Sequence, residues 1–160
     1  YNGYGATVED LHFAPAELAQ RMAGYEAPLQ FIEKELDVFE TLRNGSVEDF
    51  AKAEAATPTI VDDKVAVYLF PAEPWARRVS GVFGNQLATA NPDRAHALLT
   101  ELPQGGYVVS VRAPLNNKSG ADDLCRQFPT GGGRKAAAGI NDLPAAMYDE
   151  FVTAFKAIYA

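Results

Sequence analysis

The sequence predicts an α/β (α+β) protein with a small mixed β-sheet of about five strands flanked by helices and preceded by a helical connector arm. Apolar residues recur at spacings of three and four between residues 15 and 57, as is typical of helices. Short β-branched runs separated by turn residues follow at 59–70 and 95–112, which indicates strands. Amphipathic patterns at 75–90 and 144–158 predict two further helices in addition to these strands.

The first part of the chain, residues 1–57, is expected to be the connector arm. Its glycine- and aromatic-rich opening, residues 1–14, is interpreted as a linker or docking strand. Three helices should follow, beginning at Pro15, Pro28 and Ser46. Asn44-Gly45 is expected to close the second helix, because both residues tolerate the left-handed cap. The many acidic side chains of the arm are expected to be solvated.

Residues 58–160 are expected to form the α/β domain. The predicted elements are a hairpin at 59–70, a helix at 75–90, a hairpin at 95–112, a short helix at 121–128, a strand at 136–140 and a final helix from 141. In the second hairpin, Ser110 and Arg112 occupy alternate positions of one strand and therefore share a face. An arginine there either lies at the sheet edge or faces a bound anion, because burying it without a partner is costly.

The stretch Gly131-Gly132-Gly133-Arg134-Lys135 leads into the small residues 136–139 and is expected to be a glycine loop. Glycines admit positive φ and let the backbone bring its N–H groups close to an anion. Arg134 and Lys135 add two cations, and an arginine can hold a phosphate through two hydrogen bonds. The alternative is a plain turn with two solvated cations. For Arg78, in the 75–90 helix, a solvated surface position and a ligand role both stay open.

The composition narrows the possible functions. The formal charge of −7 excludes a protein whose whole surface binds nucleic acid, although a local basic pocket is compatible with it. Basic residues gather near the glycines, whereas acidic residues crowd the first half. Cys125 is the single cysteine, so no intrachain disulfide can form, which is typical of the cytoplasm. No segment is as long as a membrane span.

Motifs for other chemistries are missing from the sequence. His12 and His96 are far apart and lack metal-ligand spacing, so each is interpreted as a structural or surface residue. The glycine stretch matches neither the P-loop nor the dinucleotide-binding spacing, and no GxSxG elbow is present. The predicted anion site therefore has no evident nucleophile or base beside it.

The residues from the second hairpin onward resemble a known family. Val109-Ser110-Val111-Arg112, a short helix ending at Phe128 and the stretch Gly131 to Gly139 look like the C-terminal DHH-associated domain of the DHH phosphoesterase superfamily. The resemblance covers roughly residues 59–160. It implies that Arg112 and the three glycines contact substrate. One departure is Arg134, which stands where the family motif has a histidine. A guanidinium cannot exchange a proton near neutral pH as an imidazole can.

The resemblance also implies the role of the chain. The family's DHH-associated domain faces a larger N-terminal domain that binds manganese or magnesium through Asp and His residues, with substrate phosphates in the cleft between them. The chain begins at Tyr1 without an initiator Met, so that catalytic domain is expected to be missing upstream. No catalytic or metal-binding residue is assigned in this chain.

The expected function is that of a substrate-binding domain of a metal-dependent phosphoesterase. Its partners would be a nucleotide, a short single-stranded oligonucleotide or another phosphorylated small molecule, together with the catalytic domain; a homodimer is also possible. The candidate substrate-binding residues are Arg78, Ser110, Arg112, Gly131, Gly132, Gly133, Arg134 and Lys135. Two alternatives stay open: a non-catalytic protein-interaction or dimerisation module, and an acyl-CoA transferase domain, for which the chain lacks the R-x-x-G-x-G or R-x-x-G-x-A spacing.

Overall fold

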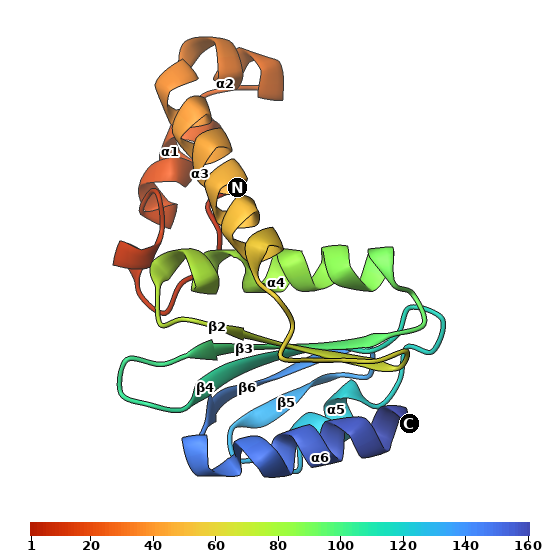
Figure 1. Ribbon diagram of the computed structural model, residues 1–160. Coiled ribbons are helices and arrows are strands. Elements are labelled where there is room, and N and C mark those ends of the chain that lie inside the picture. The colour runs from red at the N-terminus through yellow and green to blue at the C-terminus, as the bar shows by residue number, and fades with distance from the viewer.

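A six-stranded mixed sheet of order β1-β2-β3-β4-β6-β5 lies at the centre of the computed structural model, which describes all residues from 1 to 160 (Figure 1). The strands are β1 (Ile60–Val61), β2 (Val65–Phe70), β3 (Ala95–Glu101), β4 (Tyr107–Arg112), β5 (Gly131–Arg134) and β6 (Ala137–Leu143). The helices are α1 (Pro15–Ala23), α2 (Pro28–Lys34), α3 (Leu36–Ala55), α4 (Pro74–Ala90), α5 (Ala121–Cys125) and α6 (Tyr148–Tyr159), with 3-10 turns η1 (Val8–Asp10) and η2 (Ala145–Met147). The predicted α/β class is confirmed.

The sheet has six strands because the expected glycine loop is itself a strand. Gly131–Arg134 pairs antiparallel with β6. The prediction of a loop at this place was therefore wrong. Glycine has a low intrinsic preference for strands, and only the ladder of hydrogen bonds to a neighbouring strand makes such a segment extended.

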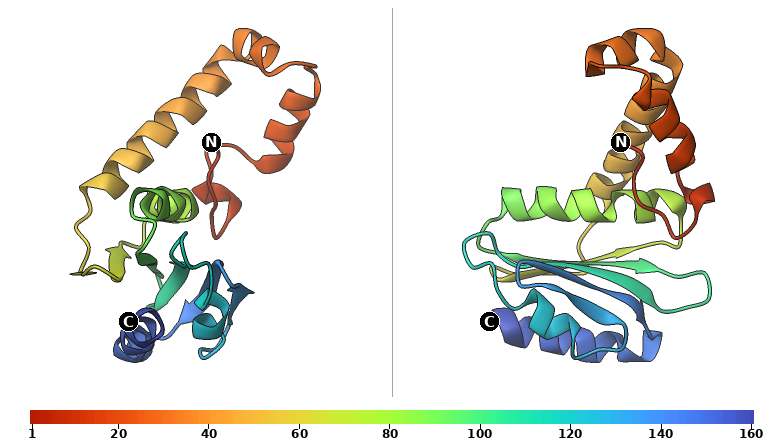
Figure 2. Two further views of the ribbon diagram at one scale, coloured as in Figure 1. Left: turned by 90° about the vertical axis from the view of Figure 1, so that its right-hand side faces the viewer. Right: turned by 180° about the vertical axis from the view of Figure 1, so that it is seen from behind.

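Helices cover the two faces of the sheet unequally. Helix α4 connects the parallel strands β2 and β3 and packs on one face, over β3 and β4 (Figures 1 and 2). Helices α5 and α6 lie on the opposite face, where their apolar side chains join the main core of the protein. That core includes Leu124 from α5 and Phe151 and Phe155 from α6. None of the helices is both long enough and apolar enough to cross a membrane.

The arm rises from the α4 side of the sheet, and its longest element is the 20-residue helix α3 (Figure 2). The helix runs through Asn44 and Gly45 without a break, so the expected cap at this place was wrong. Gly45 serves close packing instead. A Cβ atom at Gly45 would lie 2.3 Å from atoms of the His12 ring, so only glycine lets the opening segment approach α3 this closely.

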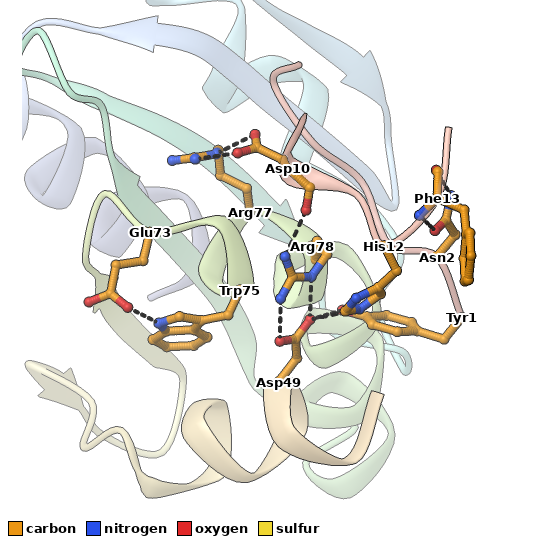
Figure 3. A network of polar contacts seen from close by, with 10 residues as sticks. All are labelled: Tyr1, Asn2, Asp10, His12, Phe13, Asp49, Glu73, Trp75, Arg77 and Arg78. Atoms are coloured by element: carbon orange, nitrogen blue, oxygen red, sulfur yellow. Dashed lines mark hydrogen bonds and ion pairs between the residues drawn. The ribbon is translucent and has the colours of Figure 1, made fainter. Parts of the chain in front are cut away.

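Two buried ion pairs fasten the arm and the opening segment to α4 (Figure 3). Arg77 Nε and Nη2 donate to the carboxylate of Asp10 at 2.7 and 2.6 Å. Arg78 Nε and Nη2 donate to the carboxylate of Asp49 at 2.7 and 2.8 Å, and Arg78 Nη1 donates to the carbonyl oxygen of Asp10 at 2.7 Å. The expectation that acidic residues of this region are solvated was wrong for these two, because each meets an arginine of α4.

The fold also buries one histidine in its neutral form. His96 on β3 is 1% exposed, and desolvation lowers its pKa from 6.5 to about 4, with the Arg94 charge acting in the same direction. Between these two pH values the unfolded chain binds a proton at His96 that the folded chain does not bind. The free energy of unfolding should therefore fall as the pH falls through this range, by about 3 kcal/mol at most from this residue.

Urea unfolding at about pH 7 and about pH 4.5 measures this loss. His96→Leu should remove most of it, since leucine does not titrate. His12→Gln is the comparison variant: burial also lowers the pKa of His12, but His12 is more exposed than His96, so its replacement should remove a smaller part of the loss. An acid-induced loss of the same size in His96→Leu and in the unmodified chain would contradict the prediction.

Candidate anion-binding site

Strand register places four of the predicted site residues on one face of the sheet. Ser110 of β4 lies opposite Gly139 of β6, and Gly139 lies opposite Gly132 of β5. The next row runs in the same way from Arg112 through Ala137 to Arg134. Because alternate residues of a strand point to the same side, Ser110, Arg112, Gly132 and Arg134 share one face.

This shared face is the one that carries α4. Ser110 pairs with Leu98 of β3, and Leu98 belongs to the apolar cluster beneath α4. Helix α4 packs on β3 and β4, so the part of this face formed by β6 and β5 extends beyond the helix. We call the bare surface of Gly132, Ala137 and Gly139 the glycine shelf. Arg112 and Arg134 flank it.

The three consecutive glycines differ in whether, and why, the fold requires glycine at their position. A Cβ atom on Gly131 would lie 1.7 Å from the carbonyl oxygen of Cys125, so glycine is required there by packing against α5. Gly133 has a φ of +143°, and a Cβ atom would lie 2.5 Å from the Cα of Ala138. A Cβ atom on Gly132 would meet nothing within 4 Å. The fold therefore does not require glycine at 132, and the space above it is open.

Arg112 is held in place entirely by neutral groups. Its Nε donates to Asn85 Oδ1 at 2.7 Å, and its Nη2 donates to the carbonyl oxygen of Gly81 at 3.1 Å. Its Nη1 donates to Ser110 Oγ at 2.9 Å and to the carbonyl oxygen of Val111 at 3.1 Å. These contacts fix the guanidinium beside the shelf but do not neutralise its charge.

The positive charge at the shelf is uncompensated within the chain. Six ion pairs join arginine and carboxylate side chains, His12 lies 4.0 Å from Asp49, and none of these contacts involves Arg112, Arg134 or Lys135. Desolvation, together with the neighbouring Arg134 charge, lowers the pKa of Arg112 below its usual range. A hollow of about 260 Å³ opens beside Arg112 and is also lined by Asn85, Lys118 and Ala137. A bound anion would relieve the repulsion between the two arginines.

The remaining predicted residues lie differently. Arg78 has all three guanidinium nitrogens occupied by Asp49 and Asp10, so it fastens the arm and is not free for a ligand at the shelf. Lys135 is exposed at the turn between β5 and β6, and its carbonyl oxygen accepts a hydrogen bond from the Ala121 amide. Gly131 and Gly133 alternate with Gly132 and so belong to the opposite face of β5.

Residues of α4 and of the opening segment complete the surroundings of Arg112, and sequence reasoning did not assign them to the site. Asn85 and Gly81 supply acceptors for the guanidinium. Tyr4 lies next to Gly81, at 3.9 Å from the position of a Cβ atom built on that glycine. The only sequence signal for Tyr4 is its position between two glycines, which by itself indicates flexibility as readily as close packing.

No group of three or more His, Cys, Asp or Glu side chains is placed to hold a metal ion in this chain. The residues of this chain therefore do not by themselves fit a manganese or magnesium ion. A hollow of about 710 Å³ lies in the arm and is lined mainly by apolar side chains such as Leu18, Phe31 and Phe39. Its lining does not suit a phosphate.

Among the comparisons with known proteins, the one with solved structures finds proteins of similar fold. No protein-family model matches the sequence, and a search of curated proteins finds no match. Among solved structures, the chain is similar to RecJ from Thermus thermophilus in complexes with Mg²⁺ and with Mn²⁺, with a TM-score of 0.65 and 20% identity. The similarity to the Mg²⁺ complex covers 89% of this chain and 22% of RecJ.

Two further structures are similar over most of this chain. One is a pGpG-specific phosphodiesterase, PggH from Vibrio cholerae, with a TM-score of 0.56, 14% identity and coverage of 83% of this chain and 46% of that protein. The other is an exopolyphosphatase-related protein from Bacteroides fragilis, with a TM-score of 0.51, 17% identity and coverage of 78% and 38%. The chain thus spans less than half the length of each of these proteins. A further similar structure is described as a DHH domain, with a TM-score of 0.52, 14% identity and coverage of 81% of this chain, and the likeness of all these structures to the chain is one of fold.

Proposed function

We propose that this chain is the substrate-binding domain of a metal-dependent phosphoesterase of the DHH type. Its ligand would be a nucleotide, a short oligonucleotide or another phosphorylated compound, with a phosphate group on the glycine shelf. Arg112 and Arg134 would hold the phosphate from the two sides, and the exposed Lys135 would add charge at the rim. The proteins of similar fold support this role, since their names include a phosphodiesterase and an exopolyphosphatase-related protein.

The observation that carries the proposal is that the half-buried guanidinium of Arg112 has no carboxylate partner. A half-buried guanidinium without a carboxylate partner is costly unless an anion completes the site. The two arginines of α4, Arg77 and Arg78, are each paired with a carboxylate instead. The open space above Gly132 lies on the same sheet face as Arg112, as a ligand position requires.

The proposed division of labour follows from the residues present. Metal ions and the attacking water would be supplied by a catalytic domain outside this chain, because the chain itself has no suitable ligand cluster. The residues of this chain would neutralise the phosphate charge from the opposite wall of the cleft. With Arg134 in place of the motif histidine, the shelf would act as an electrostatic clamp and would not transfer protons.

The direct test is titration of the chain with a nucleoside monophosphate, followed by two-dimensional NMR so that weak binding is detected. Arg112→Gln and Arg134→Ala should each reduce the affinity by about 10- to 100-fold, the usual cost of removing a charge-assisted hydrogen bond of about 1.5–3 kcal/mol. Arg43→Ala is the matched control. Arg43 is also an exposed arginine, but it lies on α3 in the arm and bonds only to the side chain of Asn44.

The titration also separates the alternatives. Absence of binding for every phosphate ligand, in this chain and in a longer chain that contains it, would contradict the proposal. A protein-interaction module would be favoured if Arg134→Ala had the same affinity for the nucleotide as the unmodified chain. Arg134→Ala should in that case also still bind a partner protein. Binding of coenzyme A alone, lost in Arg134→Ala, would favour an acyl-CoA transferase domain.

A further inference from the structure

Tyr4 is a large aromatic residue that the fold holds rigidly at the surface. Its side chain is 73% exposed, although the backbone on both sides is packed closely. Gly3 has a φ of +77°, and a Cβ atom there would lie 2.5 Å from the Cβ of Arg78. On the other side, a Cβ atom on Gly5 would lie 2.6 Å from the Cβ of Asp10. Because neither glycine has a side chain, the opening segment packs closely against Arg78 and Asp10, which the buried ion pairs hold in place.

Tyr4 borders a second hollow, of about 270 Å³, close to the glycine shelf. Gly81 and Ser80 of α4 line it on one side, and Thr100 of β3 and Val108 of β4 line it on another. Val108 is on the same strand as Ser110 and Arg112, at alternate positions of one face. Each two-residue step along a strand is about 7 Å, so Val108 lies about 7 Å along the strand from Ser110 and about 14 Å from Arg112 on the same face.

The tyrosine ring and Arg112 meet above the same glycine. Ring atoms Cδ2 and Cε2 of Tyr4 and atom Nη2 of Arg112 are all 3.9 Å from the position of a Cβ atom built on Gly81. A ligand whose phosphate contacts Arg112 would therefore bring its next group to the side of the Tyr4 ring. Flat aromatic groups stack favourably on such a ring.

The hollow also contains polar groups for recognition. Arg77 lines it, and Arg77 Nη1 is buried without a hydrogen-bond partner, whereas Nε and Nη2 are bound to Asp10. The Nη1 atom has almost no accessible surface, so a ligand in the hollow does not reach it as the side chain lies. The hydroxyl groups of Ser80 and Thr100 offer donors and acceptors. Nucleobases combine a flat face with acceptors on their edges.

We propose that the hollow beside Tyr4 binds the base of the nucleotide whose phosphate lies on the glycine shelf. The base stacks on Tyr4, its edge lies beside the hydroxyl groups of Ser80 and Thr100, and the sugar lies over Ser110. This inference rests on the proposed function, since it takes the phosphate position as its starting point. It adds the class of ligand, which is a nucleotide in preference to a phosphorylated compound without an aromatic base.

The test compares guanosine 5′-monophosphate with ribose 5-phosphate, which has the same phosphorylated sugar but no base. The unmodified chain should bind the nucleotide at least tenfold more tightly. Tyr4→Ala should abolish this preference without changing the affinity for ribose 5-phosphate, whereas Tyr4→Phe should keep it. Arg112→Gln should weaken the binding of both ligands, because it acts on the phosphate.

The outcomes distinguish the two proposals. If ribose 5-phosphate binds and depends on Arg112, but the nucleotide binds no more tightly, the base site is refuted and the phosphate site stands. If Tyr4→Ala weakens both ligands equally, Tyr4 does not act on the base and the inference also fails. If neither ligand binds to this chain or to a longer chain that contains it, both proposals fail. Thermal unfolding of Tyr4→Ala should match the unmodified chain, since the side chain is exposed.

Discussion

Gly131→Ala is expected to destabilise the protein severely, whereas Gly132→Ala, one residue away, is expected to leave its stability almost unchanged. The Cβ atom added at Gly131 would lie 1.7 Å from the carbonyl oxygen of Cys125, and backbone atoms must move to relieve this clash. Overpacking of this kind costs about 3 kcal/mol or more. At Gly132 the added methyl group meets nothing within 4 Å, so the change should lie within about 0.5 kcal/mol.

The same pair of variants tests the glycine shelf. In Gly132→Ala the methyl group occupies the space proposed for the phosphate, so nucleotide affinity should fall at least tenfold while the melting temperature stays the same. Calorimetric melting and ligand titration on both variants provide the two measurements. Unchanged nucleotide affinity in Gly132→Ala would show that the ligand does not lie on the shelf. Equal melting temperatures for the two variants would contradict the packing assigned to Gly131.

Asp49→Ala is expected to have the second large effect on stability. Asp49 is 2% exposed at its side chain and accepts two hydrogen bonds from Arg78, whose side chain is 14% exposed. It also accepts a hydrogen bond from the hydroxyl group of Tyr1 at 3.1 Å. Removing the carboxylate leaves the arginine charge buried without compensation, which costs about 3–5 kcal/mol. Urea unfolding at neutral pH measures this loss.

Glu48→Ala is the matched control for Asp49→Ala. Glu48 is the residue before Asp49 in α3, and its replacement by alanine removes the same charge. Glu48 is exposed, however, and makes no ion pair. Its replacement should change the free energy of unfolding by about 0.5 kcal/mol or less. A similar loss in both variants would mean that net charge, and not the contact with Arg78, accounts for the effect. Hydrogen exchange in α3 should rise only in Asp49→Ala, because that helix is fastened through Asp49.

Much of the fold was predictable because local patterns dominate it. The hairpin at 59–70, helix α4 and the hairpin at 95–112 follow from periodicity and turn residues, and the structure contains all three. The glycine segment was predicted as a loop because glycine has no side chain to reveal its partner strand. The division of the chain near residue 57 stays a prediction, although the helices end at Ala55 and the sheet begins at Ile60.

The individual roles of residues were less predictable. Sequence reasoning left both a surface position and a ligand role open for Arg78, and it could not find the partners of Arg77 and Arg78, which are Asp10 and Asp49. Those partners are 67 and 29 positions away along the chain. Such pairs form only when the arm returns to α4. Asp49 was expected to be solvated, but it is the partner of Arg78, so Arg78 is not free to bind a ligand at the candidate site.

By itself, the sequence determined most of the helices and strands, the concentration of basic residues near the glycines and the resemblance in Ser110, Arg112 and the glycine stretch. The tertiary structure alone decided which charges are free to bind an anion. Strand register placed Arg112 and Arg134 in one row across Ala137 and left Gly132 uncovered. The physical reason is that charge compensation and open space depend on contacts between distant segments, whereas periodicity and turn chemistry depend on neighbours in the chain.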